Sequence, residues 1–144
     1  MQYLTDLRKN LIRKMTIAPT SHGAGTVTGT AVDFRDGLTR VELEISVGAV
    51  ASGGTAVIKL QQSTNNNTAD LAPTTGAADP YSAITDGEDT PTDLSISISA
   101  ADANSIVFLN VDRRTEIWLK AVAVVSTAAI EFGVNLVSVR RDNV

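Results

Sequence analysis

Apolar and polar residues alternate along much of the chain after residue 26, which is the pattern of β-strands buried on one face. The clearest case is the segment 41–47, where Val41, Leu43, Ile45 and Val47 alternate with glutamate and serine. The same period returns at 56–61, after the turn-forming sequence AVASGG. These two segments are predicted to form a hairpin with a loop longer than the tight two-residue type.

Other segments with strand character complete the predicted fold. They lie at 27–34, 94–99, 106–111, 116–125 and 130–139, and the sequence STAA separates the last two. About seven or eight strands with short polar connections are typical of two packed sheets. We therefore predict an all-β fold, an antiparallel β-sandwich or jelly roll, over residues 26–144.

The N-terminal segment has a different period. Four apolar residues recur at steps of three and four, as on one face of a short helix: Leu4, Leu7, Leu11 and Met15. Four basic residues lie largely off that face: Arg8, Lys9, Arg13 and Lys14. Such a short helix needs a surface to dock against. Pro19 would end it, and TSHGAGTVTG resembles a flexible connection, so we predict that residues 1–25 form a basic arm or helix.

A long polar region at 63–93 interrupts the strand pattern, and a loop of that length is either functional or disordered. Leu71, Tyr81 and Ile84 are candidates to pack parts of it. Four acidic residues cluster near its end: Asp86, Glu88, Asp89 and Asp93. A basic N-terminus and an acidic middle often mark an interface, and a solvated surface without a partner is the alternative. The basic partner surface would be the arm or four arginines of an adjacent subunit: Arg113, Arg114, Arg140 and Arg141.

Composition narrows the function classes. The 144 residues suit one domain, and the absence of cysteine excludes disulfides and thiolate chemistry. A net charge of −4 argues against general nucleic-acid binding. The longest strongly apolar run, AVAVV, is far too short for a bilayer, and the N-terminus shows no signal-peptide pattern, so no membrane partner is expected.

Candidate chemistry is sparse. His22, the only histidine, lies on the predicted flexible connection, which supplies no group to orient a catalytic base or to share a metal. The glycines of GAGTVTG precede a strand, whereas a dinucleotide loop precedes a helix. The acidic cluster offers oxygen ligands for Ca²⁺ but lacks EF-hand spacing. We predict no cofactor, no metal and no enzymatic activity, while a small hydrolase using His22 or paired carboxylates stays open as an alternative.

Three longer segments resemble a known class of protein. They are GTAVDF (29–34), GGTAVIKLQQSTNNNTADL (53–71) and SAADANSIVFLNVDRRTEIWLKAVAVV (99–125), before a last strand ending in SVRRD. Together they are similar to the capsid decoration, or cement, proteins of tailed bacteriophages, of the small jelly-roll type. The resemblance covers roughly residues 27–142, and KLQQS and AADAN…DRR are its most specific pieces. The sequence TNNNTADLAP and the acidic insertion depart from the short turn of the family pattern.

This resemblance implies a structural virion protein that binds the outside of a phage capsid and stabilises it. Its partner would be the phage major capsid protein. It would be synthesised in the host cytoplasm and then located on the capsid surface of the virion. A homo-oligomer is expected, with a trimer favoured. The basic arm and the acidic cluster would form interfaces. Trp118 would either anchor an interface or occupy a core position in a strand that is buried on both faces. The alternative function is a carbohydrate-binding or adhesin-like β-sandwich module of a virion.

Overall fold

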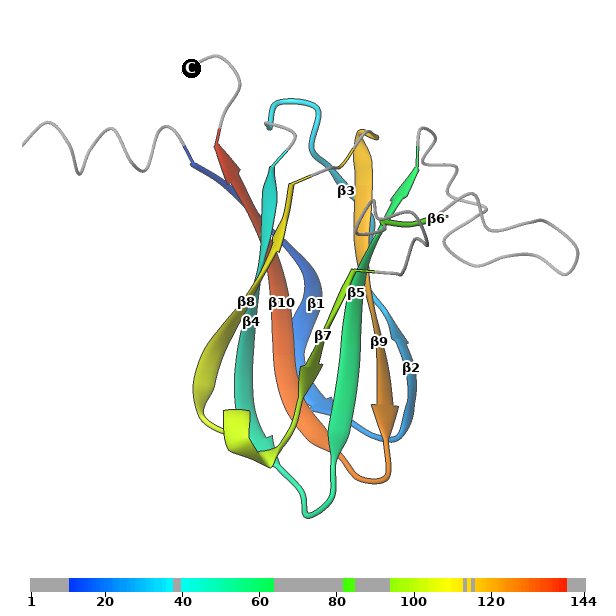
Figure 1. Ribbon diagram of the computed structural model, residues 1–144, viewed down its shortest axis with the longest axis vertical. Helices are drawn as coiled ribbons and strands as arrows, with labels where there is room; N and C mark the ends of the chain where they lie inside the picture. Colours follow the sequence, from blue (N-terminus) through cyan, green and yellow to red (C-terminus); the bar gives the residue numbers. More distant parts are fainter. Residues whose placement is uncertain are drawn as a thin grey trace, which may run out of the picture.

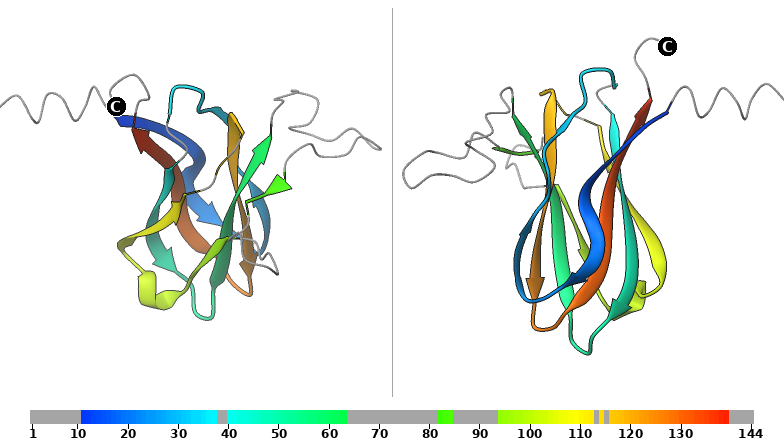
Figure 2. Two further views of the ribbon diagram at one scale, coloured as in Figure 1. Left: turned by 45° about the horizontal axis from the view of Figure 1, so that its top comes forward. Right: turned by 180° about the vertical axis from the view of Figure 1, so that it is seen from behind.

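The computed structural model describes residues 11–37, 40–63, 82–84, 94–112, 114 and 116–139. These residues form two antiparallel sheets packed face to face (Figures 1 and 2). The predicted antiparallel β-sandwich is therefore confirmed.

One sheet has four strands in the order β1-β10-β4-β8. They are β1 (Leu11–His22), β10 (Ile130–Val139), β4 (Val41–Val50) and β8 (Ser105–Val111). In the second sheet, β9 (Trp118–Ser126) pairs with β2 (Gly25–Thr28), β3 (Val32–Asp33) and β5 (Thr55–Ser63). β5 also pairs with β6 (Ser82–Ala83) and β7 (Ser95–Ile98). The 3-10 turn η2 (Ala100–Asp102) connects β7 to β8.

The core lies between the two sheets and follows the predicted alternation. In β4, Leu43 and Ile45 are fully buried while the alternating glutamates, Glu42 and Glu44, are partly exposed. In β5, Ile58 and Leu60 are fully buried in the same way. Each such side chain contributes about 1.5–3 kcal/mol when it leaves water, so the inward faces of both sheets stabilise the sandwich.

The predicted hairpin between residues 41–47 and 56–61 is wrong, because β4 and β5 belong to different sheets. The sequence AVASGG crosses from one sheet to the other and turns at Gly53, which has a φ of +77°. A side chain at that φ is strained, so glycine is favoured there. Alternation shows that one face of each strand is buried. It does not distinguish burial beside a neighbour from burial against an opposing sheet.

The predicted N-terminal helix is wrong for Leu11 to Met15, which lie in β1. This strand pairs with β10 from Leu11 opposite Val139 to His22 opposite Ile130, so residues 11–22 belong to the sandwich and not to an arm. Register shifts follow Met15 and Ile17 and break the two-residue period. The broken period imitated helical spacing, and pairing with β10 outweighs the weak helical preference of a short segment. Residues 1–10 lie outside the described part.

The glycine-rich connection after β1 is held by hydrogen bonds that link it to β1 and β9. The Thr16 hydroxyl donates to the Thr30 carbonyl oxygen at 2.8 Å and accepts the Ala121 N–H at 3.1 Å. Gly29 donates its N–H to the Ala121 carbonyl oxygen at 2.8 Å. A Cβ on Gly29 would lie 2.3 Å from Thr16 Oγ1, so only glycine fits without movement. The glycine here serves close packing between the two sheets.

Most of the long polar region at 63–93 lies outside the described residues. Ser63 ends β5, and Ile84 is buried after β6. The Ile84 N–H donates to the Leu60 carbonyl oxygen at 3.2 Å, and its own carbonyl oxygen accepts the Leu94 N–H at 2.8 Å. The prediction that Ile84 packs a piece of this region onto the domain is confirmed. The same prediction for Leu71 and Tyr81 concerns residues outside the described part.

Candidate functional site

The surface of the four-stranded sheet that points away from the other sheet mixes apolar and charged side chains. We call it the outer face, and it consists of Leu11, Arg13, Met15, Glu42, Glu44, Ser46, Ile106, Phe108, Asn110, Asn135, Val137 and Val139. The strand registers place these residues in rows that cross the sheet. One row joins Met15 to Asn135, Asn135 to Glu44, and Glu44 to Phe108. In this row apolar groups therefore lie at both borders of the sheet, with polar groups between them.

The outer face carries the most exposed large apolar side chains of the described residues. Ile106 is 57% exposed, Met15 55% and Phe108 52%. Leu11 and Val139, opposite each other in the β1–β10 pair, are each 38% exposed. Single exposed apolar residues are common, but several on one face make that face a candidate contact surface. The outer face is therefore the candidate functional site.

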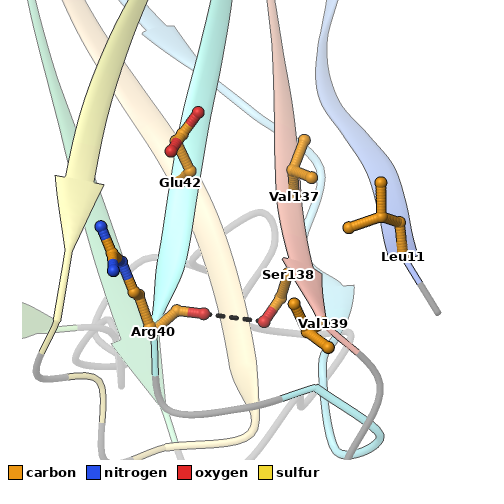
Figure 3. Close-up of a pocket in the computed structure, with 6 residues that line it drawn as sticks. All are labelled: Leu11, Arg40, Glu42, Val137, Ser138 and Val139. Atoms are coloured by element: carbon orange, nitrogen blue, oxygen red, sulfur yellow. Dashed lines mark hydrogen bonds between the residues drawn. The ribbon is translucent and has the colours of Figure 1, made fainter. Parts of the chain in front are cut away.

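A pocket of about 350 Å³ opens at one end of the outer face (Figure 3). Leu11, Val137 and Val139 supply its apolar wall, and Arg40 and Glu42 border it on the side of β4. The Ser138 hydroxyl donates to the Arg40 carbonyl oxygen at 2.7 Å and so joins the residue before β4 to β10. The pocket can accept an apolar side chain of a partner, with charged groups at its rim.

Sequence reasoning named only Leu11 and Arg13 from the outer face as interface residues. Ile106 and Phe108 were missed because SIVFLNV was recognised only as a strand. Its signal was apolar character at both odd and even positions. In a sheet with one solvated face, that pattern places apolar side chains in water as well as in the core.

The two described basic residues predicted to dock onto a partner, Arg13 and Lys14, both contact their own chain, and their docking role stays a prediction. Arg13 forms an ion pair with Glu44 across the outer face. Lys14 points to the side of β1 that faces the second sheet, where it donates to the Asp33 carbonyl oxygen and lies 5.7 Å from the Phe34 ring centroid. Lys14 therefore does not belong to the outer face.

Arg114, proposed above as a partner for acidic groups of another subunit, is buried and 5% exposed. Its guanidinium donates to the carbonyl oxygens of Phe34, Gly37 and Glu116 at 2.7–2.8 Å. It also lies 5.9 Å from the centre of the Phe34 ring. That prediction is wrong for Arg114, because the side chain is buried and these bonds hold it inside its own domain.

Trp118 begins β9 and is half-buried, opposite Asp33 on β3 and Ser63 on β5. Leu119 faces the core, so Trp118 lies on the opposite side of the second sheet, as predicted. On that same side Lys120 is 2% exposed and Val122 is buried, whereas Val124 is exposed. β9 is thus buried on both faces over its first half, and an interface role for Trp118 stays a prediction.

Several predicted interface residues lie outside the described part of the chain. They are Leu4, Leu7, Arg8, Lys9, Asp86, Glu88, Asp89, Asp93, Arg113, Arg140 and Arg141. Their roles stay predictions.

His22 lies in β1 and not on a flexible connection. Its ring packs on Phe132 at a centroid distance of 4.5 Å, and Nε2 lies 3.1 Å from the Phe132 carbonyl oxygen. Within the described ranges, no group of three or more His, Asp or Glu residues could hold a metal ion. In the same part of the chain, no helix has the length and hydropathy needed to cross a bilayer.

The sequence matches no protein-family model and no curated protein. Its function must therefore be argued from the surface chemistry described above.

Proposed function

We propose that this protein is a structural virion protein that binds the outside of a phage capsid and stabilises it. The observation that carries the proposal is the outer face, where the three most exposed large apolar side chains of the described residues lie. A protein that joins capsid subunits needs a stable scaffold and a broad contact surface. The sandwich core supplies the scaffold and the outer face supplies the surface.

The chemistry of the outer face suits contact with another protein. Apolar groups such as Met15 and Phe108 provide area that gains free energy when it leaves water. Glu42 and the Arg13–Glu44 ion pair provide polar contacts that select the orientation of the partner protein. The pocket at Leu11 and Val139 offers a site for one anchoring apolar side chain.

The resemblance to decoration proteins agrees with where its segments lie. KLQQS forms the second half of β5. SIVFLNV forms β8, a border strand of the four-stranded sheet that supplies part of the outer face. These pieces build sheet and turns, so they support a structural role more than a chemical one. The carbohydrate-binding alternative expects exposed aromatic residues beside a groove. The pocket lining described above contains no aromatic residue, and no described observation favours that alternative.

Co-sedimentation with shells assembled from the phage major capsid protein tests the proposal. The wild-type protein is expected to bind with a saturable copy number. Met15→Lys places a charge in the contact, and the loss of one apolar anchor of about 1.5–3 kcal/mol predicts roughly 10–100-fold weaker binding. Val124→Lys is the matched control, because Val124 is 47% exposed on the other sheet.

The proposal fails if the wild-type protein does not sediment with the shells. The assignment to the outer face fails if Met15→Lys and Val124→Lys bind equally well. Saturable binding to a glycan array without binding to shells would favour the carbohydrate-binding alternative.

A further inference from the structure

The four-stranded sheet has two borders, and only one of them is protected against pairing with another strand. β1 forms the first border and carries Arg13, Lys14 and Pro19 together with two register shifts. Charge, proline and bulges are the devices by which proteins prevent edge pairing. β8 forms the second border and has none of them. Its sequence is SIVFLNV, and its register with β4 is unbroken from Ser105 to Val111.

β8 is the last strand of the four-stranded sheet, with β4 as its only strand neighbour among the described residues (Figures 1 and 2). The alternation of the ladder shows which of its peptide groups face outward. The Asn104 N–H donates to the carbonyl oxygen of Gly48, which lies opposite it in the β4–β8 register, at 3.1 Å. Even-numbered residues of β8 are therefore the hydrogen-bonded ones, and Ser105, Val107 and Leu109 direct their N–H and C=O groups to the open border.

We propose that β8 pairs with β8 of a second copy of this chain, antiparallel and across a twofold axis at Val107. The four-stranded sheets of two copies then join into one continuous sheet. This register provides about six backbone hydrogen bonds through Ser105, Val107 and Leu109 of both copies. It also places Ile106 opposite Phe108 of the second copy, twice, on the outer face.

The side chains favour this partner and this register. Ile106 and Phe108 fall in non-hydrogen-bonded pairs, in which opposing side chains approach most closely. A β-branched residue opposite an aromatic one is a stabilising cross-strand pair, and here it covers two of the most exposed side chains of the described residues.

Charge also favours a second copy over a foreign peptide. β8 contains no charged residue, so two copies pair without like-charge repulsion. The flanking acids are held within their own chain, because the Asp102 carboxylate accepts the Ser99 N–H at 2.9 Å and Asp112 lies 3.3 Å from Arg40. A charged peptide segment would find no counter-charge on the strand. The occupant is therefore a copy of the same apolar, uncharged strand.

Cross-linking tests the geometry directly, because the chain has no cysteine of its own. In an antiparallel hydrogen-bonded pair the Cα atoms lie about 5.5 Å apart, within the range that a disulfide spans. Val107→Cys is expected to form a covalent dimer on mild oxidation. Val57→Cys is the control, because Val57 is 43% exposed on the other sheet, away from β8, and this variant should form no covalent dimer at the same concentration.

Sedimentation equilibrium tests the association without an added bond. A pairing of this small area predicts a dimer with a Kd on the order of micromolar. Phe108→Lys adds the residue that natural edge strands use against pairing, and it should weaken the dimer at least tenfold while thermal unfolding shows an intact fold.

A wild-type monomer up to about 300 μM would overturn the pairing, as would a trimer or an equal cross-linking yield from Val57→Cys. A dimer that Phe108→Lys leaves intact would also overturn it. These measurements use the protein alone, so they stand apart from any result on capsid binding.

Discussion

Replacing Arg114 by methionine should destabilise the domain strongly, although Arg114 touches none of the residues of the outer face in its described contacts. The side chain is buried and donates to the carbonyl oxygens of Phe34 and Gly37 at 2.8 and 2.7 Å. A third bond reaches the Glu116 carbonyl oxygen at 2.8 Å. Methionine keeps a stem of similar length but donates no hydrogen bond, so Arg114→Met removes the donors with little change in volume.

The size of the effect follows from the two most buried of these bonds. A hydrogen bond to a charged group contributes about 1.5–3 kcal/mol, so losing the bonds to Phe34 and Gly37 predicts a loss of about 3–6 kcal/mol. That is a large part of the roughly 5–15 kcal/mol that stabilises a typical domain. The stability of Arg114→Lys should fall between those of the wild-type protein and Arg114→Met. An ammonium still donates hydrogen bonds but lacks the planar fork that reaches several acceptors.

Urea denaturation followed by the fluorescence of Trp118, the only tryptophan, measures this loss. Arg40→Met is the matched control, since the Arg40 and Asp112 side chains are 66% and 70% exposed in their ion pair. An exposed pair contributes about 0–1 kcal/mol. If Arg114→Met costs no more than Arg40→Met, the buried guanidinium does not hold the 34–37 segment and the reasoning is refuted.

Two further predictions concern the backbone. Gly29→Ala should destabilise the domain by about 1–3 kcal/mol, because the new Cβ would lie 2.3 Å from Thr16 Oγ1 and 2.8 Å from two carbonyl oxygens. Gly23 has open space around it, so the control Gly23→Ala should change stability by less than about 0.5 kcal/mol. Thr127 lies in a turn closed by the Ala128 N–H, which donates to the Ser126 carbonyl oxygen at 2.9 Å. Its φ of 71° strains a β-branched residue, so Thr127→Gly should stabilise the domain by about 1 kcal/mol. Thermal unfolding measures both, and an unchanged Gly29→Ala protein or a less stable Thr127→Gly protein would contradict the respective argument.

The candidate site could be predicted only in part. Glu42 and Glu44 follow from alternation, because they interrupt an apolar series that must face the core. Leu11 and Arg13 were predicted at an interface, but as parts of a helix. Ile106, Phe108 and Met15 become one surface only through the registers of β1, β10, β4 and β8, which join residues far apart in the chain.

The sequence by itself determined most of the segments that become strands and which of their faces are buried, because a two-residue period is a local property of the chain. It did not determine strand partners. β4 and β5 follow one another and yet lie in opposing sheets, since their apolar faces are buried by meeting across the core. Only the tertiary structure decided that β1 is a strand, because its pairing with β10 tolerates bulges that hide the period. It also decided that Arg114 lies inside, since the carbonyl oxygens of Phe34 and Gly37, far from it in the chain, converge on it together with that of Glu116 and offset the cost of its burial.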